Sequence, residues 1–490
     1  MSNKYKKHRD EQIIAWLVTI VLLALIVTGV YFGIKYLKAP VAEKVNQVFS
    51  HDEPREAPEE TVKEEEESQP AEEGIDEEKL SAIFDGQEEE EEGEEQDAKT
   101  EDPADPLMDE ASGIVEKMSL EQQVAQMFFV TPESITGVET ATAAGEKTRL
   151  ALLEHPVGGV ILFERNIESG QQLKTMNENL QRFSQESVSL PLFIGVDEEG
   201  GSVTRLAGNE ALSGDENESP DGDDADGAPA EDESEDTAED ETEGAAQIKE
   251  VPPMSEIKEE KEAYEAGNTI GSYLKYYGFN LDFAPVADVA EDGVKSALGD
   301  RIFSSDPEVT AGMVSSYLSG LHDAGVLGCP KHFPGQGSVT EDTHEGRAVT
   351  EKDWGDLKEK DLVPFRRAID EKVKFIMVSH MSVPEVTGDE KPASMSGIVL
   401  TEKLRLDMGY KGIAITDAMN MGAVTDGMDS DEAVLLAIKA GADMILMPGD
   451  FESAYESVLS AAGDGSISPE RIAESVRRIV YVKLFLKENG

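Results

Sequence analysis

The sequence is poor in cysteine, in basic residues and in long apolar runs, and each shortage excludes a class of protein. The single cysteine, Cys329, rules out an intrachain disulfide and lies too far downstream to carry an N-terminal lipid. Lysine and arginine number 43 against 103 acidic residues, which gives a formal net charge of −60. Because binding to nucleic acid needs clustered cations, we expect no nucleic-acid partner.

The negative charge is concentrated in two segments. Residues 41–110 and 207–250 together hold about two-thirds of the net charge. Such segments cannot bury enough apolar surface to offset the entropy lost on ordering. We therefore expect a disordered acidic linker over residues 37–111, and a disordered acidic insertion at about 208–250 within a folded domain that spans residues 112–490.

One long apolar run is present, near the N-terminus. It extends from Ile13 to Ile34 without a charged residue, which corresponds to about 33 Å of helix and is enough to cross a bilayer. The run is longer than a signal-peptide core, and basic residues precede it. The pattern predicts a cytoplasmic tail over residues 1–11 and an uncleaved transmembrane anchor over residues 12–36. The protein is thus expected at the cell membrane, with the remainder of the chain outside the cytoplasm.

Eight short apolar runs alternate with longer amphipathic stretches after residue 112. In chain order the runs are QMFFV, GGVILF, PLFIGV, FNLDFAPV, GVLGCP, FIMVSH, GIAIT and ADMILM. This alternation indicates an α/β fold with a parallel sheet, and eight units favour a (β/α)8 TIM barrel. An open doubly wound sheet is the alternative, but no glycine-rich dinucleotide turn follows the early runs. We expect no cofactor.

Polar residues follow five of these runs, where a barrel would carry its catalytic groups. They are Asp197, Asp288, the Lys331–His332 pair, His380 and Asp417. Asp417 could act as a nucleophile or a general base, or it could simply cap a following helix, since aspartate is favoured in both places. The local sequence leaves both interpretations open.

The densest cluster of polar residues is the segment KHFPGQGSVTEDTH, residues 331–344. Lys331 and His332 could hold substrate hydroxyls or form a solvated loop. Asp342 and His344 are two residues apart, and a carboxylate beside an imidazole can form an acid/base dyad. A surface ion pair is the alternative for these two residues. Metal binding by the two histidines would need a third ligand, and the spacing offers none.

The chain resembles glycoside hydrolase family 3, in its single-domain branch of bacterial β-N-acetylglucosaminidases. The resemblance covers roughly residues 112–487. It rests on nine segments in the same order, namely SLEQQVAQMFFV, GGVILFERNI, PLFIGVDEEGGSVTRL, FNLDFAPVADV, GDRIFSSDP, KHFPGQGSVTEDTH, DLVPFRRAI, PASMSGIVL and GIAITDAMNMGAV.

This resemblance implies a role for each candidate residue. Asp417 matches the nucleophile that forms a covalent glycosyl-enzyme, and His344 with Asp342 matches the acid/base dyad on a mobile loop. The residues that match those binding the hydroxyls and N-acetyl group of the terminal sugar are Asp197, Arg205, Arg301, Lys331 and His332. Three positions depart from the family pattern, Gln336 in place of histidine, Ser202 in place of arginine, and Ala418 in place of aspartate.

The expected activity is that of a membrane-anchored retaining exo-β-N-acetylglucosaminidase. Its expected substrate is a glycan or peptidoglycan fragment that ends in N-acetylglucosamine, and the expected state is a monomer without metal. A β-glucosidase of the same family and a catalytically silent sugar-binding wall protein are the alternatives.

Overall fold

The computed structural model describes residues 105–212, 248–341, 343, 346–425 and 428–489. The chain divides into two compact units, Met1–Asp85 and Gly86–Gly490, and all described residues belong to the second. The expected anchor and most of the expected linker lie outside the described residues, as does most of the expected acidic insertion. None of the helices in the described part is both long and apolar enough to span a bilayer.

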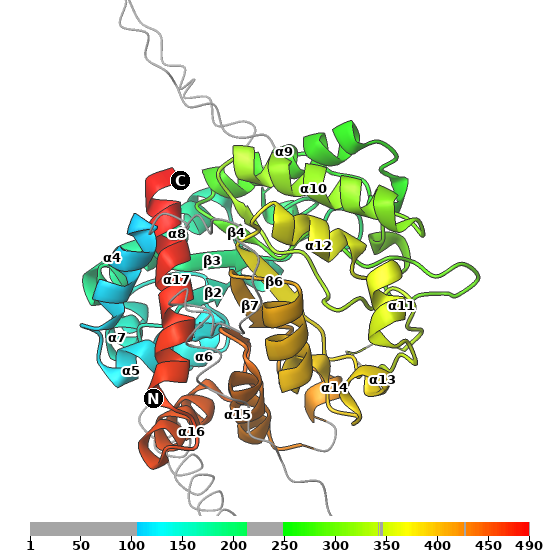
Figure 1. Ribbon diagram of the computed structural model, residues 1–490. Helices are drawn as coiled ribbons and strands as arrows, with labels where there is room; N and C mark the ends of the chain where they lie inside the picture. Colours follow the sequence, from blue (N-terminus) through cyan, green and yellow to red (C-terminus); the bar gives the residue numbers. More distant parts are fainter. Residues whose placement is uncertain (1–104, 213–247, 342, 344–345, 426–427, 490) are drawn as a thin grey trace, which may run out of the picture. The chain divides into compact units, whose positions relative to one another are not determined.

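Eight short parallel strands form the centre of this unit, and each lies inside one of the eight predicted apolar runs (Figure 1). They are β1 (Phe128–Val130), β2 (Gly159–Ile161), β3 (Phe193–Val196), β4 (Leu281–Asp282), β5 (Leu327–Gly328), β6 (Phe375–Val378), β7 (Ile413–Thr416) and β8 (Ile445–Leu446). Every residue in these strands is buried, as expected for a sheet that is covered on both faces.

The strand pairings run around a ring. One sheet has the order β5-β4-β3-β2-β1-β8, and β6 pairs with β7. Two parallel bridges, Phe333↔Val378 and Ile415↔Met444, join the two sheets at both gaps. The α/β fold is therefore consistent with the predicted barrel.

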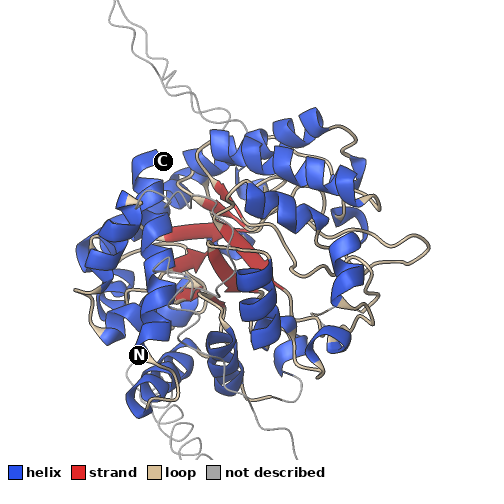
Figure 2. Ribbon diagram, in the orientation of Figure 1, coloured by secondary structure: helices blue, strands red, loops and turns tan. Residues whose placement is uncertain are grey.

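Helices surround the strands (Figure 2). They are α4 (Pro106–Val115), α5 (Leu120–Gln126), α6 (Pro132–Thr136), α7 (Glu146–Glu154), α8 (Gly170–Val188), α9 (Glu260–Tyr276), α10 (Pro307–Asp323), α11 (Trp354–Glu359), α12 (Val363–Asp370), α13 (Pro384–Thr387), the π-helix η7 (Ile398–Asp407), α14 (Gly422–Thr425), α15 (Ser430–Ala440), α16 (Phe451–Asp464) and α17 (Pro469–Asn489). Short 3-10 turns are η1 (Glu164–Asn166), η2 (Glu210–Leu212), η4 (Met254–Glu256), η5 (Gly299–Arg301) and η6 (Ala393–Met395).

Local sequence explains where several helices begin. Asp306 caps α10 by accepting hydrogen bonds from two backbone amides, and Pro307 occupies the first turn. Asp105 caps α4 by accepting the backbone N–H of Leu107, and Pro106 occupies the first turn. Helix α4 packs against α17, so ordered structure begins before residue 112, the expected start of the domain.

Aromatic pairs from well-separated strands fill the interior. The rings of Phe129 and Phe283, from β1 and the end of β4, lie edge to face with centroids 5.2 Å apart. Phe193 of β3 and Phe375 of β6 form a similar pair at 5.0 Å. The centre is therefore a packed core, so a substrate must bind at one end of the strands.

Candidate active site

The predicted polar residues gather at the carboxyl ends of the strands. Asp197 directly follows β3, His380 follows β6 by two residues, and Asp417 directly follows β7. Lys331 and His332 come three and four residues after β5 ends. Because the strands are parallel, these positions share one edge of the ring.

A network of two carboxylates and two cations occupies part of this edge. Lys331 Nζ lies 2.8 Å from Asp197 Oδ1 and 2.7 Å from Glu199 Oε1. Arg301 binds Glu199 with both arms of its guanidinium, Nε to Oε2 at 2.8 Å and an Nη to Oε1 at 2.7 Å. Glu199 therefore contacts two residues to which the family resemblance gives a sugar-binding role, Lys331 and Arg301, and Lys331 joins a third, Asp197, to the network.

The charges in this network stabilise one another. Burial alone would raise the pKa of the Glu199 carboxyl, but the charges of Lys331 and Arg301 outweigh it and lower the pKa to about 2. Burial disfavours the Lys331 ammonium, yet Asp197 and Glu199 raise its pKa above the usual lysine value. Side-chain exposure is 2% for Glu199, but 21% for Asp197 and 20% for Arg301. Asp197 and Arg301 can therefore reach a ligand. Buried Glu199 fixes the position of Arg301 directly and that of Asp197 through Lys331.

A second buried carboxylate, Asp288, orients His332. Asp288 Oδ2 lies 2.8 Å from His332 Nδ1 and accepts the His332 backbone N–H at 3.1 Å. Its other oxygen accepts the Gln336 backbone N–H at 2.5 Å. The turn fits closely here, because a Cβ on Gly337 would lie 2.1 Å from the Val289 carbonyl oxygen. Since a carboxylate only accepts, Nδ1 carries the proton and the other ring nitrogen is left for a ligand.

Asp417 lies beside this histidine in a partly exposed position. Its Oδ1 accepts the backbone N–H of Ala418 at 2.8 Å. Burial raises the pKa of its carboxyl, but the nearby imidazoles of His332 and His380 and the hydrogen bond from the Ala418 amide bring the pKa below the usual aspartate value. The next helix, α14, begins only at Gly422, so Asp417 is not a helix cap and that alternative is wrong.

His380 supports the same region without being exposed. Its Nε2 lies 3.1 Å from the Ala418 carbonyl oxygen and its Nδ1 lies 2.7 Å from Ser394 Oγ. Because a carbonyl oxygen only accepts, Nε2 carries the proton and Nδ1 accepts from the serine hydroxyl. Burial lowers the pKa of His380, partly opposed by Asp417, so the ring is neutral at pH 7.

Arg205 stands apart from the charged network. Its guanidinium donates to the Thr204 carbonyl at 3.0 Å and lies 5.8 Å from the ring centroid of Phe163. Its position is fixed through the backbone, because buried Glu198 accepts the amides of Arg205, Leu206 and Ala207 at 2.6, 3.0 and 2.9 Å.

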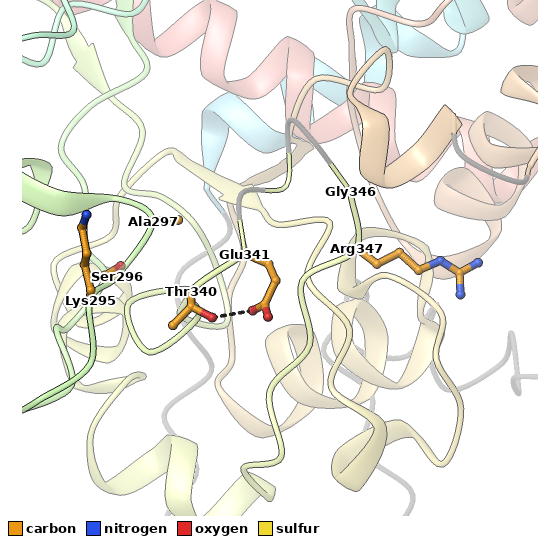
Figure 3. A pocket seen from close by; sticks show the side chains of 7 residues that line it. All are labelled: Lys295, Ser296, Ala297, Thr340, Glu341, Gly346 and Arg347. Carbon is orange, nitrogen blue, oxygen red and sulfur yellow. Dashed lines mark hydrogen bonds between the residues drawn. The ribbon is translucent and has the colours of Figure 1, made fainter.

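The predicted dyad residues, Asp342 and His344, lie outside the described residues. Parts of their loop that are described line a cavity of about 550 Å3 together with the loop that follows β4 (Figure 3). The lining residues are Lys295, Ser296, Ala297, Thr340, Glu341, Gly346 and Arg347. In Figure 3 the Thr340 hydroxyl is bonded to Glu341, and the Arg347 side chain points away from both.

Glu199, Asp288 and Gln336 were not predicted as site residues. Glu199 is two residues after Asp197, and residues two apart at the end of a strand share a side, which was the available signal. Asp288 was noted at a strand end without a role. Nothing in the sequence near Gln336 pointed to its partners.

Comparison with known proteins identifies a common family. The family model described as "Glycosyl hydrolase family 3 N terminal domain" matches residues 119–213 and 238–482. A Beta-hexosaminidase of Nitrosomonas eutropha is 31% identical over 318 residues, which cover 63% of this chain and 78% of the relative. Beta-hexosaminidase A of Pseudoalteromonas piscicida is 29% identical and matches 69% of this chain, which spans only 54% of that relative.

A solved structure has a similar fold. A glycoside hydrolase family 3 beta-N-acetylglucosaminidase from Paenibacillus sp. has 30% sequence identity and a TM-score of 0.63. The match covers 76% of this chain and 62% of that chain.

Proposed function

The chain belongs to glycosyl hydrolase family 3, and from this we propose that it is a retaining exo-β-N-acetylglucosaminidase. The relatives described above are named beta-hexosaminidases, and the solved neighbour is titled a beta-N-acetylglucosaminidase. The observation that carries the proposal is the position of Asp417, which directly follows β7 and lies partly exposed beside His332.

In this proposal Asp417 attacks the anomeric carbon of the terminal sugar as the bond to the leaving oxygen breaks. His344, oriented by Asp342, donates a proton to that oxygen and later removes one from the water that releases the sugar. Two displacements at one carbon give net retention. Lowering the pKa of Asp417 keeps the carboxylate ionised at neutral pH, which a nucleophile requires.

The remaining site residues would hold the terminal sugar. Asp197 and Arg301 are partly exposed charged groups, each paired within the network that buried Lys331 completes, and such groups suit sugar hydroxyls. His332 and Arg205 would complete the contacts to the hydroxyls and the N-acetyl group. Such groups are already paired in the protein, so little ordering is needed when a sugar binds.

The assay compares nitrophenyl β-N-acetylglucosaminide with the matching β-glucoside, using the purified full-length chain. We expect release from the acetamido sugar and a loss of at least about 1,000-fold in Asp417→Ala. Asp464→Ala is the matched control, because it removes an exposed carboxylate at the end of α16. Preference for the glucoside would replace the proposed substrate, and full activity in Asp417→Ala would reject the nucleophile.

We also propose peptidoglycan fragments as the substrate and the membrane as the location. The support is the basic tail, the apolar run over residues 12–36 and the acidic linker, which would extend a tethered domain away from the bilayer. Cell fractionation of the full chain and of a variant lacking residues 12–36 tests the anchor. Recovery of both in the soluble fraction would reject it.

A further inference from the structure

His380 is a buried side chain next to Asp417, and no step of the proposed mechanism uses it. It is 1% exposed, so a bound sugar cannot contact it directly. Its Nε2 donates to the Ala418 carbonyl oxygen at 3.1 Å, and its Nδ1 accepts from Ser394 Oγ at 2.7 Å. The ring therefore contacts the residue that directly follows Asp417 in the chain.

The backbone holds Ser394 opposite this ring. The Ser394 N–H donates to the Ser379 carbonyl at 3.0 Å, and the Ala393 N–H donates to the Met381 carbonyl at 2.8 Å. These two bonds lie on either side of His380, and Ser394 is itself fully buried. The serine hydroxyl therefore fixes the orientation and the tautomer of the imidazole before any ligand binds, which directs Nε2–H to the turn after β7.

The turn that carries Asp417 is held at three successive residues. The Asp417 N–H donates to the Val378 carbonyl at 2.9 Å, and the Met419 N–H donates to the Leu446 carbonyl at 2.9 Å. These bonds attach the turn to the ends of β6 and β8. Between them, Ala418 donates its N–H to Asp417 Oδ1 at 2.8 Å, while its carbonyl accepts the imidazole N–H. The buried ring and the carboxylate are thus bonded to the two ends of one residue.

We propose that His380 is a positioning residue for the nucleophile, because it fixes Ala418 and with it the N–H that orients the Asp417 carboxylate. This inference rests on the proposed function, which makes Asp417 the nucleophile. The Ala418 carbonyl also accepts the Met421 N–H at 3.1 Å, so loss of the imidazole would loosen the turn without unfolding it. A displacement of about 1 Å in a reacting group can lower the rate about 100-fold.

A covalent labelling reaction tests this role separately from proton transfer. With a 5-fluorinated N-acetylglucosaminyl fluoride, an Asp417 oxygen forms a bond to the anomeric carbon as the C–F bond breaks and fluoride leaves. Fluoride departs without a proton, so the labelling rate depends on the placement of the nucleophile and not on a general acid. Inhibition by free N-acetylglucosamine measures the sugar-binding groups, which follow other strands.

The experiment measures the labelling rate constant and the inhibition constant of N-acetylglucosamine for the purified full-length chain. His380→Leu removes the N–H at similar volume, and we expect labelling to slow about 30- to 100-fold while the inhibition constant stays within about twofold. His380→Gln restores a donor near the position of Nε2 and should recover labelling to within about fivefold of the unchanged chain. Ser394→Ala keeps the ring but frees its tautomer, which should slow labelling about three- to tenfold.

His155→Leu is the matched control, because it makes the same substitution at a histidine near the amino ends of the strands. His155 lies between α7 and β2, and its ring packs edge to face against those of Phe451 and Tyr455. This variant should leave both constants unchanged. Thermal unfolding of every variant measures whether the fold is retained.

The outcomes separate this inference from the function on which it rests. If the unchanged chain acquires no sugar on Asp417, the proposed nucleophile is wrong and the inference falls with it. If the unchanged chain is labelled there and His380→Leu is labelled within about threefold of the same rate, the positioning role alone is wrong.

Two further results would also overturn the positioning role. Equal losses in His380→Leu and His380→Gln would mean that the N–H donor is not what matters. Parallel losses of labelling and of N-acetylglucosamine binding would indicate a general loss of the pocket. If His380→Leu does not fold, Ser394→Ala decides the question, because an unchanged labelling rate in that variant overturns the inference.

Discussion

Each end of the strand ring contains a buried carboxylate that is paired with two cations, but the two clusters differ in how exposed their members are. At the carboxyl ends Glu199 lies between Lys331 and Arg301, and at the amino ends Asp443 lies between Arg405 and Arg478. Both arginines at the amino end are 6% exposed. The network at the carboxyl end instead leaves Arg301 and Asp197 about one-fifth exposed. A buried ion-pair cluster therefore does not by itself indicate a binding site. The cluster at the carboxyl ends differs in having paired groups that are partly exposed.

The partners of Asp443 are all supplied by the protein. Besides the two arginines, it accepts the Ser475 hydroxyl at 2.6 Å and the Ala414 backbone N–H at 2.9 Å. Burial raises the pKa of the Asp443 carboxyl, but the surrounding arginines lower it below the usual value. A carboxylate with both oxygens satisfied in this way stabilises the fold and has no exposed edge for a substrate.

We expect the largest loss of activity from a substitution of Lys331, in the cluster at the carboxyl ends of the strands. Lys331→Met removes the cation shared by Asp197 and Glu199, so the exposed groups lose both charge balance and position. We expect kcat/KM on nitrophenyl β-N-acetylglucosaminide to fall about 1,000-fold, or about 4 kcal/mol. Lys411→Met, at an exposed lysine before β7, is the control. A loss below tenfold would mean that the network is structural at both ends.

The corresponding change at the amino end should affect stability instead. Asp443→Asn leaves buried arginines without their counter-charge, which costs about 3–5 kcal/mol of unfolding free energy. Denaturant unfolding measures this loss. Activity per folded molecule should stay within about twofold of the unchanged chain. A selective loss of kcat in folded protein would show that this cluster also reaches the site.

A smaller effect is expected at Lys483, a buried lysine at the amino end that pairs with no carboxylate among the described residues. Lys483 is fully buried, donates to Gln126 Oε1 at 2.8 Å, and has its pKa lowered by burial to about 7. The unfolded chain therefore binds more protons than the folded chain between about pH 7 and 10.4, so stability rises with pH across that window.

Lys483→Met removes this dependence. From pH 7 to 9.5, the unfolding free energy of the unchanged chain should gain about 3 kcal/mol relative to the variant. Chemical denaturation at several pH values measures the difference. Parallel pH curves for the two proteins would show that Lys483 is charged throughout, and that the amino end tolerates an unpaired cation.

The strands could be predicted from the sequence because each is a short apolar run, and burial on both faces demands that pattern. The positions of Asp197, Lys331 and Asp417 followed from the same runs, since each comes at or soon after a strand end. The spacing of Glu199 from Asp197 indicated that the two residues share a side, but its pairing with Arg301 could not be predicted, because Arg301 is 102 residues away in the chain. The helix-cap alternative at Asp417 could be excluded only from the structure, which places the next helix start at Gly422.

Identifying the residue that forms a covalent bond to the sugar tests the account most directly. The full-length chain would be incubated with a fluorinated N-acetylglucosaminide whose glycosyl-enzyme breaks down slowly, then digested and mapped by mass spectrometry. The account predicts one sugar on the peptide that contains Asp417, and none in Asp417→Ala. A label on another residue, or continued turnover with an inverted product, would contradict it.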